Sequence, residues 1–376
     1  MNMSQKDTDR EMSVAILTSH AHALPPKAIG AVEKLFYDLA QVWCDAGIEV
    51  TFYSVLGGEL GKNSVVRMRG FKGSSNVYLE ILKDFFYSFY FWLKLKKTDI
   101  VLLNTFWSPF FARFFRRKYQ RVIYGVHRFP KRQFFLYRCV DDFICVSMTV
   151  ANAVKEKFPY LASRVSCINN PIKTEVFNIE GRKKSDGIYT ILYAGRIHPE
   201  KGLDILVSAF HRLKTEGCVC RLVLVGAISS ENGGGGDKYV VKLREIDDQI
   251  EFKSPVYDPK KLAEIMKQVD CFVYPSVAAQ GESWGVAPLE AMACGLPTIV
   301  SDLECFREYG EPEKNILMFK RGDNADEELA VQIKRVMSDP ALANALGHNA
   351  AETACRFSTD HIADQYRKHF INLLDK

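Results

Sequence analysis

The sequence predicts an α/β protein made of two doubly wound domains, each a parallel sheet with helices on both faces. Short apolar runs rich in β-branched residues recur along the 376-residue chain, with helical stretches between them. This pattern is typical of strands buried on both faces of a parallel sheet. Residues 1–178 carry 25 Lys+Arg and 15 Asp+Glu (+10), whereas residues 179–376 carry 25 and 30 (−5). A polar stretch at 178–187 lies between these halves, so we expect two domains with different partners.

The expected strands form two sets, one in each half of the chain. They are 13–20, 48–54, 99–104, 121–127 and 142–147 in the first half, and 189–196, 220–227, 249–254, 271–276 and 297–302 in the second. A long helix is expected from about Val32 to Ala46, because Gly47 can end it. Ligands of such sheets bind beyond the carboxyl ends of the strands. The expected ligand-binding edges therefore lie at the strand ends Ser19-His20, His127, Arg196, Gly226 and Ser276.

The composition is that of an ordinary globular protein, with 47% apolar and 25% charged residues. No apolar run reaches the roughly 18 residues that a membrane-spanning helix needs. The first twelve residues are polar and include acids, unlike a secretory signal peptide, and the ten cysteines include no Cys-x-x-Cys pair. We therefore expect a cytoplasmic protein with reduced thiols.

The stretch GESWGVAPLEAMACGLPTIVSD (281–302) combines a polar turn, a short helix and a strand. Pro288 fits only the first turn of a helix, so the helix should begin near 285–287 and end at Gly295. The turn before it then offers free amide groups and the positive end of the helix dipole, which suit a phosphate. The backbone expected to bind there is that of Ser283, Trp284, Gly285 and Val286.

Two glutamates flank this turn. Glu282 precedes it and Glu290 follows it, on the order of 10 Å apart at a rise of 1.5 Å per residue. That distance is the scale of a nucleotide sugar measured from its hexose to its ribose. One carboxylate can accept hexose hydroxyl groups and the other ribose hydroxyl groups, with the diphosphate on the amides between them.

These residues resemble the Glu-x7-Glu signature of the family 4 glycosyltransferases of GT-B fold. YAGRIHPEKGLDILVSAF (193–210) resembles the diphosphate-binding Gly-Arg…Lys-Gly motif of that family, and CINNPIKTEVF (167–177) resembles its segment at the end of the first domain. FSTDHIADQYRKHF (357–370) resembles its C-terminal helix, which crosses back to the first domain. The likeness covers essentially the whole chain and is strongest over 190–310.

The resemblance implies a GT-B fold, in which two Rossmann-like domains face a central cleft. The domains implied are an acceptor-binding domain at 1–178, a nucleotide-sugar-binding domain at 188–356, and a helix at 357–376 that packs back on the first domain. The resemblance also implies a retaining glycosyltransferase that moves a hexose-type sugar without a metal. The only Asp-x-Asp, at 7–9, lies in the polar tail before any strand.

The resemblance assigns roles to individual residues. Arg196 and Lys201 are expected to hold the donor diphosphate, Glu282 the transferred sugar and Glu290 the ribose. His127 matches the first-domain histidine near the reacting centre. The catalytic residues expected are His127, Arg196, Lys201 and Glu282, and the donor-binding residues expected are Gly30, Gly195, Arg196, Lys201, Ser283, Trp284, Gly285, Val286 and Glu290. Replacing either Arg196 or Lys201 by alanine is expected to leave the thermal stability of the ligand-free protein nearly unchanged.

The chain departs from the family pattern at two places. The family often has Gly-Gly in its first loop, where this chain has Gly30-Ala31, and this leaves open how closely the backbone approaches the substrate there. Pro171 and Lys173 replace the glycine and aspartate of the family's Asn-Gly-x-Asp segment, which Asn170 otherwise matches. We interpret these replacements as structural changes near the hinge.

The segment 100–140 holds nine Lys+Arg, twelve aromatic residues and no acid. Preceding it, 83–97 reads as a helix that is apolar nearly all round. Cations beside aromatic residues suit an anionic membrane surface, and we expect the cations at 113 and 116–118 (Arg113, Arg116, Arg117 and Lys118) to contact it. A core helix with a solvated basic face is the alternative. Nucleic acid is not expected, because no nucleic-acid motif is present.

A glycine-rich loop at 229–238 follows an expected strand end. It is either a tolerated surface insertion or a loop that closes over ligand.

The sequence therefore predicts a peripheral enzyme of the inner face of the cytoplasmic membrane that takes part in surface polysaccharide or glycolipid synthesis. The donor is expected to be a nucleotide-diphosphate sugar, with UDP favoured over GDP and no further cofactor. The acceptor is expected to be a glycan or a polyisoprenoid-linked glycan. Two alternatives remain open: a nucleotide-sugar epimerase or hydrolase of the same fold, and a non-catalytic membrane-bound nucleotide-sugar sensor.

Overall fold

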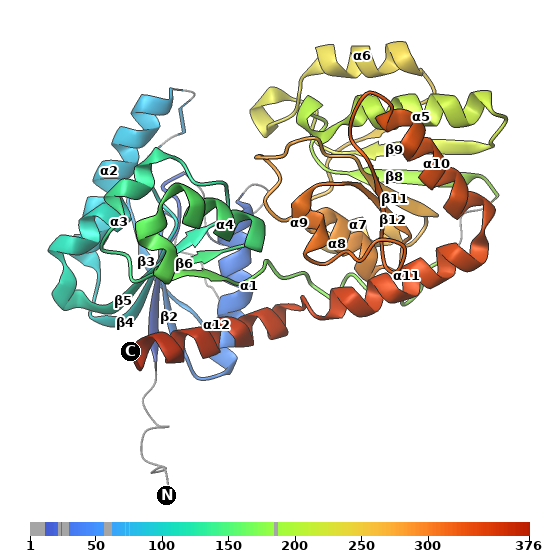
Figure 1. The fold of residues 1–376 in the computed structure, drawn as a ribbon. Coiled ribbons are helices and arrows are strands. Elements are labelled where there is room, and N and C mark those ends of the chain that lie inside the picture. The colour runs from blue at the N-terminus through green and yellow to red at the C-terminus, as the bar shows by residue number, and fades with distance from the viewer. Residues whose placement is uncertain are drawn as a thin grey trace, which may run out of the picture. The chain divides into compact units, whose positions relative to one another are not determined.

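The structure is a computed structural model that describes residues 12–21, 24, 30–55, 62–71, 73–74, 76–183 and 187–376. The polar tail with the Asp-x-Asp at 7–9 lies outside the described residues. The chain forms two compact units (Figure 1). The first unit combines Met1–Asn170 with Thr359–Lys376, and the second is Pro171–Ser358.

The first unit is built on a seven-stranded parallel sheet with the strand order β3-β2-β1-β4-β5-β6-β7. Its strands are β1 (Ser13–Leu17), β2 (Glu49–Ser54), β3 (Ser64–Arg67), β4 (Thr98–Leu103), β5 (Tyr119–Val126), β6 (Asp142–Cys145) and β7 (Val165–Cys167). In the register of the sheet, Ile16 lies between Phe52 and Leu102, and all three side chains are buried. The central strands are apolar on both faces, as the sequence predicts for a covered parallel sheet.

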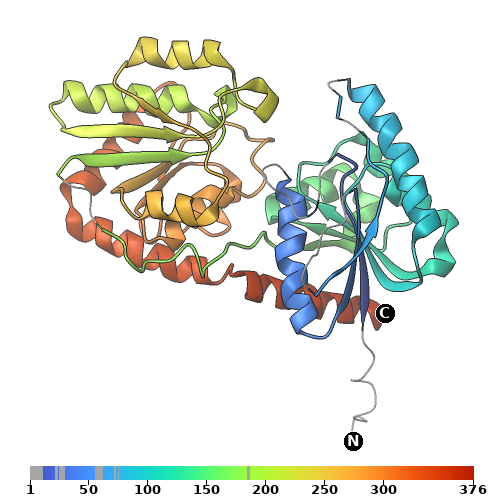
Figure 2. The same ribbon diagram turned by 180° about the vertical axis from the view of Figure 1, so that it is seen from behind.

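Helices cover both faces of this sheet. They are α1 (Ala31–Asp45), α2 (Val77–Lys94), α3 (Ser108–Phe111), α4 (Met148–Lys157) and α12 (Thr359–Leu374), with short 3-10 turns η1 (Ala112–Phe114), η2 (Arg116–Lys118), η3 (Arg132–Leu136) and η4 (Pro159–Arg164). Helix α12 lies beside α1 (Figure 2). Trp43 of α1 donates from Nε1 to the Ala363 carbonyl at 2.9 Å, and its ring packs against Tyr366 and Phe370.

The second unit has a six-stranded parallel sheet with the order β10-β9-β8-β11-β12-β13. Its strands are β8 (Tyr189–Ala194), β9 (Cys220–Val225), β10 (Glu251–Lys253), β11 (Cys271–Tyr274), β12 (Thr298–Ser301) and β13 (Leu317–Phe319). Its helices are α5 (Leu203–Thr215), α6 (Asp237–Ile246), α7 (Pro259–Met266), α8 (Val286–Ala293), α9 (Glu304–Arg307), α10 (Ala325–Ser338) and α11 (Pro340–Cys355), with η5 (Pro199–Lys201) and η6 (Ser230–Asn232). Both units are thus doubly wound α/β domains, which confirms the predicted fold class.

The chain enters the second unit at Pro171. Ile172 donates its backbone N–H to the Phe357 carbonyl at 2.8 Å and forms a parallel bridge with Ser358, and Phe177 is buried. The polar stretch that begins at 178 also packs there, because Lys183 donates its backbone N–H to the Lys267 carbonyl at 2.9 Å.

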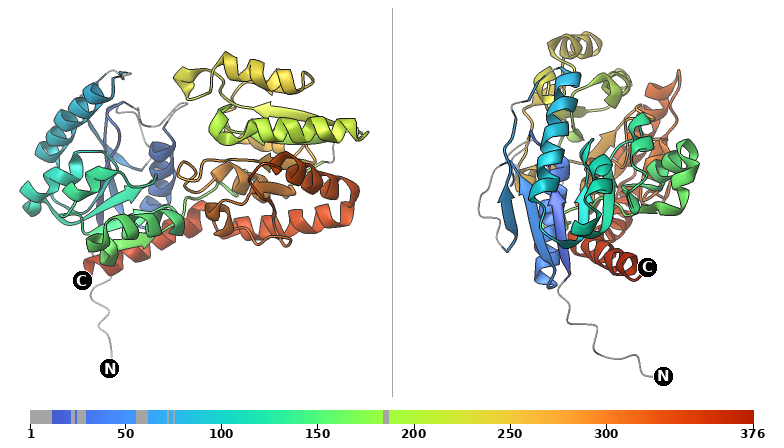
Figure 3. Two further views of the ribbon diagram at one scale, coloured as in Figure 1. Left: turned by 45° about the horizontal axis from the view of Figure 1, so that its top comes forward. Right: turned by 90° about the vertical axis from the view of Figure 1, so that its left-hand side faces the viewer.

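Helix α2 begins earlier than the predicted helix at 83–97 and runs along one side of the first unit (Figure 3). Asn76 caps it, because the Asn76 side chain accepts from the backbone N–H groups of Tyr78 and Leu79. One face of α2 is buried in the unit through Tyr87, Phe91 and other residues, whereas the opposite face is apolar and exposed. The alternative of a core helix therefore describes only one face of α2. None of the helices in the described part of the chain is long and apolar enough to cross a membrane.

Candidate active site

The candidate donor residues of the second unit come together where its strand order reverses. Strand β8 lies between β9, which follows it in sequence, and β11, which comes much later. Such a reversal leaves a crevice at the carboxyl ends of the two neighbouring strands. Arg196 follows β8 directly, and Glu282 lies in the connection between β11 and α8.

Gly202 fixes the position of Lys201. The backbone of Gly202 is left-handed, with φ of 65°, and a Cβ atom there would lie 2.2 Å from the Pro275 carbonyl oxygen. Only glycine fits such a conformation at such a close approach. The N–H of Val277 donates to the Glu200 carbonyl at 3.1 Å, which joins the segment after β8 to the segment after β11.

Lys201 and Glu282 form a buried ion pair. Lys201 Nζ lies 2.6 Å from Glu282 Oε2, and the two residues are 6% and 8% exposed. The ammonium group also lies over the ring of Tyr274, 5.3 Å from its centre. Lys201 thus does not fit the expectation that its removal leaves the thermal stability unchanged, because a buried carboxylate would lose its partner.

Three buried tyrosines surround this pair, and the sequence analysis missed them. Burial and then the charge of Glu282 raise the pKa values of Tyr193 and Tyr274 well above the usual range. Burial also raises the pKa of Tyr309, with Cys305 and Glu282 adding to the effect. All three hydroxyl groups stay protonated and can donate hydrogen bonds. The position of Tyr193 and Tyr274 at strand ends is the signal that could have found them.

Arg196 is half-exposed and already has partners. Its guanidinium donates to the Glu200 carboxylate and to the Gly233 carbonyl, the latter at 2.9 Å. Gly233 belongs to the glycine-rich loop at 229–238. That loop folds back on the end of β8, because Gly235 donates its N–H to the Ile197 carbonyl at 2.7 Å. The loop is therefore tied to the segment that carries Arg196.

The turn before α8 has the predicted form. Gly285 is the N-cap residue, with φ of 73°, and a Cβ atom there would lie 2.5 Å from the Phe306 ring. The helix begins at Val286, within the predicted range. The side chain of Trp284 is 1% exposed and packs against Tyr309 and Phe357, so only its backbone can face a ligand.

The other predicted donor-binding residues lie in both units. Ser283 and Glu290 are half-buried, in the turn and on α8 respectively. Gly195 lies against the next strand end, because a Cβ atom on Gly226 would come within 1.7 Å of the Gly195 carbonyl oxygen. Gly30 belongs to the first unit, where it is the N-cap residue of α1 with φ of 123°.

His127 of the first unit follows β5. Its ring packs edge-on against Phe36 of α1, with ring centres 5.6 Å apart. A Cβ atom on Gly125 would lie 2.9 Å from His127 Nε2, so the glycine makes room for this ring. Burial, together with the nearby charge of Arg128, lowers the pKa of His127 to about 4. His127 is therefore neutral at physiological pH.

The four predicted membrane cations are not equally available. Arg116 forms two hydrogen bonds to the Asp141 carboxylate, at 3.1 and 3.2 Å. Lys118 Nζ donates to the Trp92 and Leu93 carbonyls at the end of α2, at 2.8 Å each. Arg113 donates to two backbone carbonyls, those of Phe110 and Leu136. Within the described residues, Arg117 alone of the four has no such bond.

Two family models match the chain. The model described as Glycosyltransferase Family 4 matches residues 30–176, and the model described as Glycosyl transferases group 1 matches residues 175–353. Together they span residues 30–353, which include most of each unit. The chain belongs to the family 4 glycosyltransferases.

Curated relatives of this glycosyltransferase include a D-inositol 3-phosphate glycosyltransferase of Jonesia denitrificans, 30% identical over 46% of this chain and 40% of the relative. A capsular polysaccharide biosynthesis glycosyltransferase CapM of Staphylococcus aureus is 21% identical over 56% of each chain. An alpha-maltose-1-phosphate synthase of Mycobacterium tuberculosis is 28% identical over 60% of this chain and 62% of the relative. The chain thus spans about half the length of the curated relatives that it matches.

Solved structures show the same fold. The sucrose-phosphate synthase of Thermosynechococcus elongatus has a TM-score of 0.79 and 19% identity, covering 97% of this glycosyltransferase and 99% of that chain. HepE of Anabaena, solved in complex with UDP and glucose, has a TM-score of 0.72 and 18% identity, covering 96% and 99%. These neighbours are GT-B glycosyltransferases, and the chain has the GT-B fold.

Proposed function

We propose that this protein is a retaining glycosyltransferase that moves a hexose-type sugar from a nucleotide-diphosphate sugar to a glycan or lipid-linked glycan acceptor. The observation that carries the proposal is the buried pair of Lys201 and Glu282 at the strand-order reversal of the second unit. Such a pair offers a cation for a phosphate and a carboxylate for sugar hydroxyl groups.

The donor site follows from the same residues. Arg196 and Lys201 supply two positive charges for the diphosphate, and the free amides at the start of α8 add hydrogen-bond donors. Glu282 accepts hydroxyl groups of the hexose, and Glu290 accepts those of the ribose. We favour UDP over GDP as the nucleotide, and the HepE structures in complex with UDP and UDP-glucose support this choice.

The proposed transfer takes place on one face of the sugar. The bond between the anomeric carbon and the diphosphate oxygen breaks while the acceptor oxygen bonds to the same face of that carbon. The acceptor proton passes to the departing diphosphate oxygen, so no side chain has to form a covalent bond. Arg196 and Lys201 stabilise the negative charge that grows on the diphosphate, and the neutral ring of His127 positions the sugar.

Because two fixed cations take this charge, we propose that the reaction needs no metal ion. Turnover should then continue in excess chelator. A complete loss of activity that magnesium restores would overturn this part of the proposal.

Mass spectrometry of the products tests the function directly. The full chain is incubated with a panel of nucleotide sugars, with and without a membrane lipid extract. A product heavier by one hexose, formed only when the extract is present, is the expected result. Rapid donor consumption without acceptor would instead support the epimerase or hydrolase alternative. Donor binding without any turnover would support the sensor.

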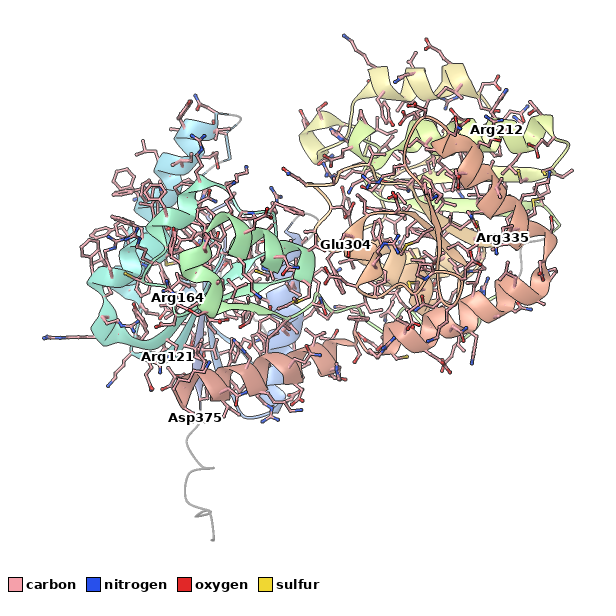
Figure 4. The ribbon with its side chains drawn as sticks, viewed as in Figure 1. Arg121, Arg164, Arg212, Glu304, Arg335 and Asp375 are labelled. Atoms are coloured by element: carbon pink, nitrogen blue, oxygen red, sulfur yellow. The ribbon has the colours of Figure 1, made fainter. Side chains whose placement is uncertain are left out.

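We also propose that the enzyme works at an anionic membrane surface, and the outer face of α2 supports this. Its exposed side chains are apolar up to the last turn, where Lys94 is exposed, and aromatic rings point outward along this helix (Figure 4). The exposed apolar residues of this face and of the adjoining η1 are Val77, Tyr78, Leu79, Leu82, Phe86, Phe89, Leu93 and Phe114. Exposed cations flank them at Lys94, Lys96, Lys97, Arg113 and Arg117. Apolar insertion beside cations is the pattern of a peripheral membrane contact.

Vesicle flotation tests this attachment. Arg116 and Lys118 stabilise the fold through their own partners, so the variant should leave them intact. Phe86→Ser with Phe89→Ser and Arg117→Ser should reduce binding to vesicles that contain anionic lipid. Val241→Ser with Lys242→Ser, which changes an exposed apolar residue and a neighbouring cation of α6, is the control. Wild-type protein that ignores anionic vesicles at low salt would contradict the proposal.

A further inference from the structure

A cavity of about 720 Å³ opens in the first unit, and none of the described residues that line it belongs to the proposed donor site. It lies beyond the carboxyl ends of β1, β2 and β3 and against the last turns of α2. The residues that give it its chemistry are His20, Arg67, Arg69, Phe71, Tyr90 and Lys94. In a parallel α/β sheet this edge is where ligands bind, and the volume is that of a small-molecule site.

The cavity has a strong positive charge. Arg67, Arg69 and Lys94 line it, and the described residues that line it include no carboxylate. Within the described residues none of these three cations pairs with an acid, and the ammonium group of Lys94 lies 5.0 Å from the centre of the Tyr90 ring. Cations held together without an acid attract an anion, and the planar guanidinium of arginine suits a phosphoryl group.

Close packing holds the arginine segment in place. Met68 donates its N–H to the Ser54 carbonyl and has a buried side chain, so Arg67 and Arg69 on either side of it lie exposed. A Cβ atom on Gly70 would come within 2.2 Å of the Val55 side chain, which leaves no room for a larger residue there. The two arginines are thus presented by a backbone that the fold determines.

The acids of the neighbourhood have other partners. Glu80 and Asp84 of α2 reach His20, with His20 Nε2 2.9 Å from Glu80 Oε2 and Nδ1 3.9 Å from Asp84 Oδ1. Glu80 also pairs with Lys83 at 2.8 Å. These carboxylates therefore pair with His20 and Lys83, and no acid among the described residues compensates the three cations of the cavity.

The cavity joins the exposed apolar face of α2. Leu82, Phe86, Tyr90 and Lys94 follow one another at intervals of four residues, so they form a single row along the helix surface. The row runs from exposed apolar side chains to the cations of the cavity. A ligand with a phosphoryl group at one end and an apolar chain at the other would match both ends.

We propose that this cavity binds a phosphoryl group of the acceptor, held by Arg67, Arg69 and Lys94. The proposal deepens the proposed function and rests on it, because it names the class of acceptor. The phosphoryl group can belong to a lipid-linked diphosphate or to a soluble sugar phosphate. The apolar row of α2 fits the lipid, and the test below separates the two.

The test is calorimetry on the full chain with saturating UDP present, so that the donor site is occupied. The probes are farnesyl diphosphate, farnesol and glucose 1-phosphate. Arg67→Gln with Arg69→Gln is the cavity variant. Lys131→Gln with Arg132→Gln removes two exposed cations of the same unit that do not line the cavity, and is the matched control.

Wild type and the control should bind a phosphorylated probe equally, and the cavity variant should bind it about tenfold more weakly or worse. If wild type binds farnesyl diphosphate but not glucose 1-phosphate, the acceptor is lipid-linked. If it binds glucose 1-phosphate but not farnesyl diphosphate, the acceptor is soluble. The proposal is overturned if the cavity variant binds the phosphorylated probe as tightly as wild type does. It is also overturned if wild type binds neither phosphorylated probe. Binding of UDP to wild type is measured separately. If wild type does not bind UDP, the proposed function is overturned instead.

Discussion

Lys201 Nζ and Glu282 Oε2 lie 2.6 Å apart in the second unit, although 81 positions separate the two residues in the sequence. The pair links the motif after β8 to the motif after β11. Each buried charge is neutralised by the other, so the site can hold both without a ligand. Whatever binds there must share this pair or replace part of it, which couples donor binding to the stability of the second unit.

Breaking the pair should destabilise the protein. Lys201→Ala leaves a buried carboxylate and Glu282→Ala leaves a buried ammonium group, so each should lower the free energy of unfolding by roughly 3–5 kcal/mol. Urea denaturation of the free protein measures this loss. Lys201→Met combined with Glu282→Leu removes both charges and should recover most of the stability while remaining inactive. Single variants as stable as wild type would show that the pair does not form.

Arg196→Ala should act mainly on catalysis. The side chain is half-exposed, so the melting temperature should change little. Loss of one stabilising contact to the leaving diphosphate should reduce kcat/KM by about 30- to 1000-fold, equivalent to roughly 2–4 kcal/mol. Arg335→Ala is the control, because Arg335 also pairs with a glutamate at the surface of this unit (Figure 4). Near-normal turnover of the Arg196 variant would remove Arg196 from the donor site.

The two glutamates should separate in binding experiments with the nucleotide alone. Glu290→Gln should weaken UDP binding, because its proposed partner is the ribose. Glu282→Gln should lower kcat, because its proposed partner is the transferred sugar. It should not weaken UDP binding, because the loss of the carboxylate releases Lys201 for the diphosphate. Calorimetry with UDP and steady-state kinetics give the two quantities. Equal effects of both substitutions on UDP binding would contradict this division of roles.

Gly202→Ala should disturb both folding and donor binding. The new methyl group would meet the Pro275 carbonyl at 2.2 Å, and the backbone there is left-handed. Gly217 is a matched control in the same unit: its φ is 84°, and nothing lies within 4 Å of a Cβ atom there. Gly217→Ala should cost only the conformational strain of about 1–2 kcal/mol. A melting temperature of Gly202→Ala no lower than that of Gly217→Ala would argue against the close approach.

His127 should make stability depend on pH in a defined direction. Its pKa is about 4 in the folded protein and about 6.5 in the unfolded chain, so only the unfolded chain gains a proton between these values. The free energy of unfolding should therefore fall as the pH drops from about 7 to 4, by roughly 3 kcal/mol. His127→Phe should remove this part of the dependence, which urea denaturation at pH 7 and pH 5 can measure. An unchanged pH dependence in the variant would place the histidine in contact with water.

The neutral state of His127 also bears on activity. A ring that stays unprotonated above pH 5 should add no ionisation to the pH profile of kcat between pH 6 and 8. Any such ionisation should survive in the His127→Phe variant.

The sequence by itself determined the architecture. Buried parallel strands are apolar on both faces, so runs such as 99–104 and 271–276 predict strands from local composition alone. The start of α8 was also predictable, because Pro288 and Gly295 restrict the backbone locally. The short edge strands β3, β7 and β13 were missed, since three or four residues are too few to show a periodicity.

The partners of each charge were decided only by the tertiary structure. The sequence predicted Lys201 as a cation for the diphosphate, but only the fold shows that Gly202 lets it approach β11 and pair with Glu282. Likewise, Asp141 lies just outside the acid-free segment but neutralises Arg116 within it. Propensity and periodicity act over a few residues, whereas burial and pairing depend on which strand ends the fold brings together. For the same reason the sequence indicated that α2 is apolar, and only the fold decided which of its faces stays exposed.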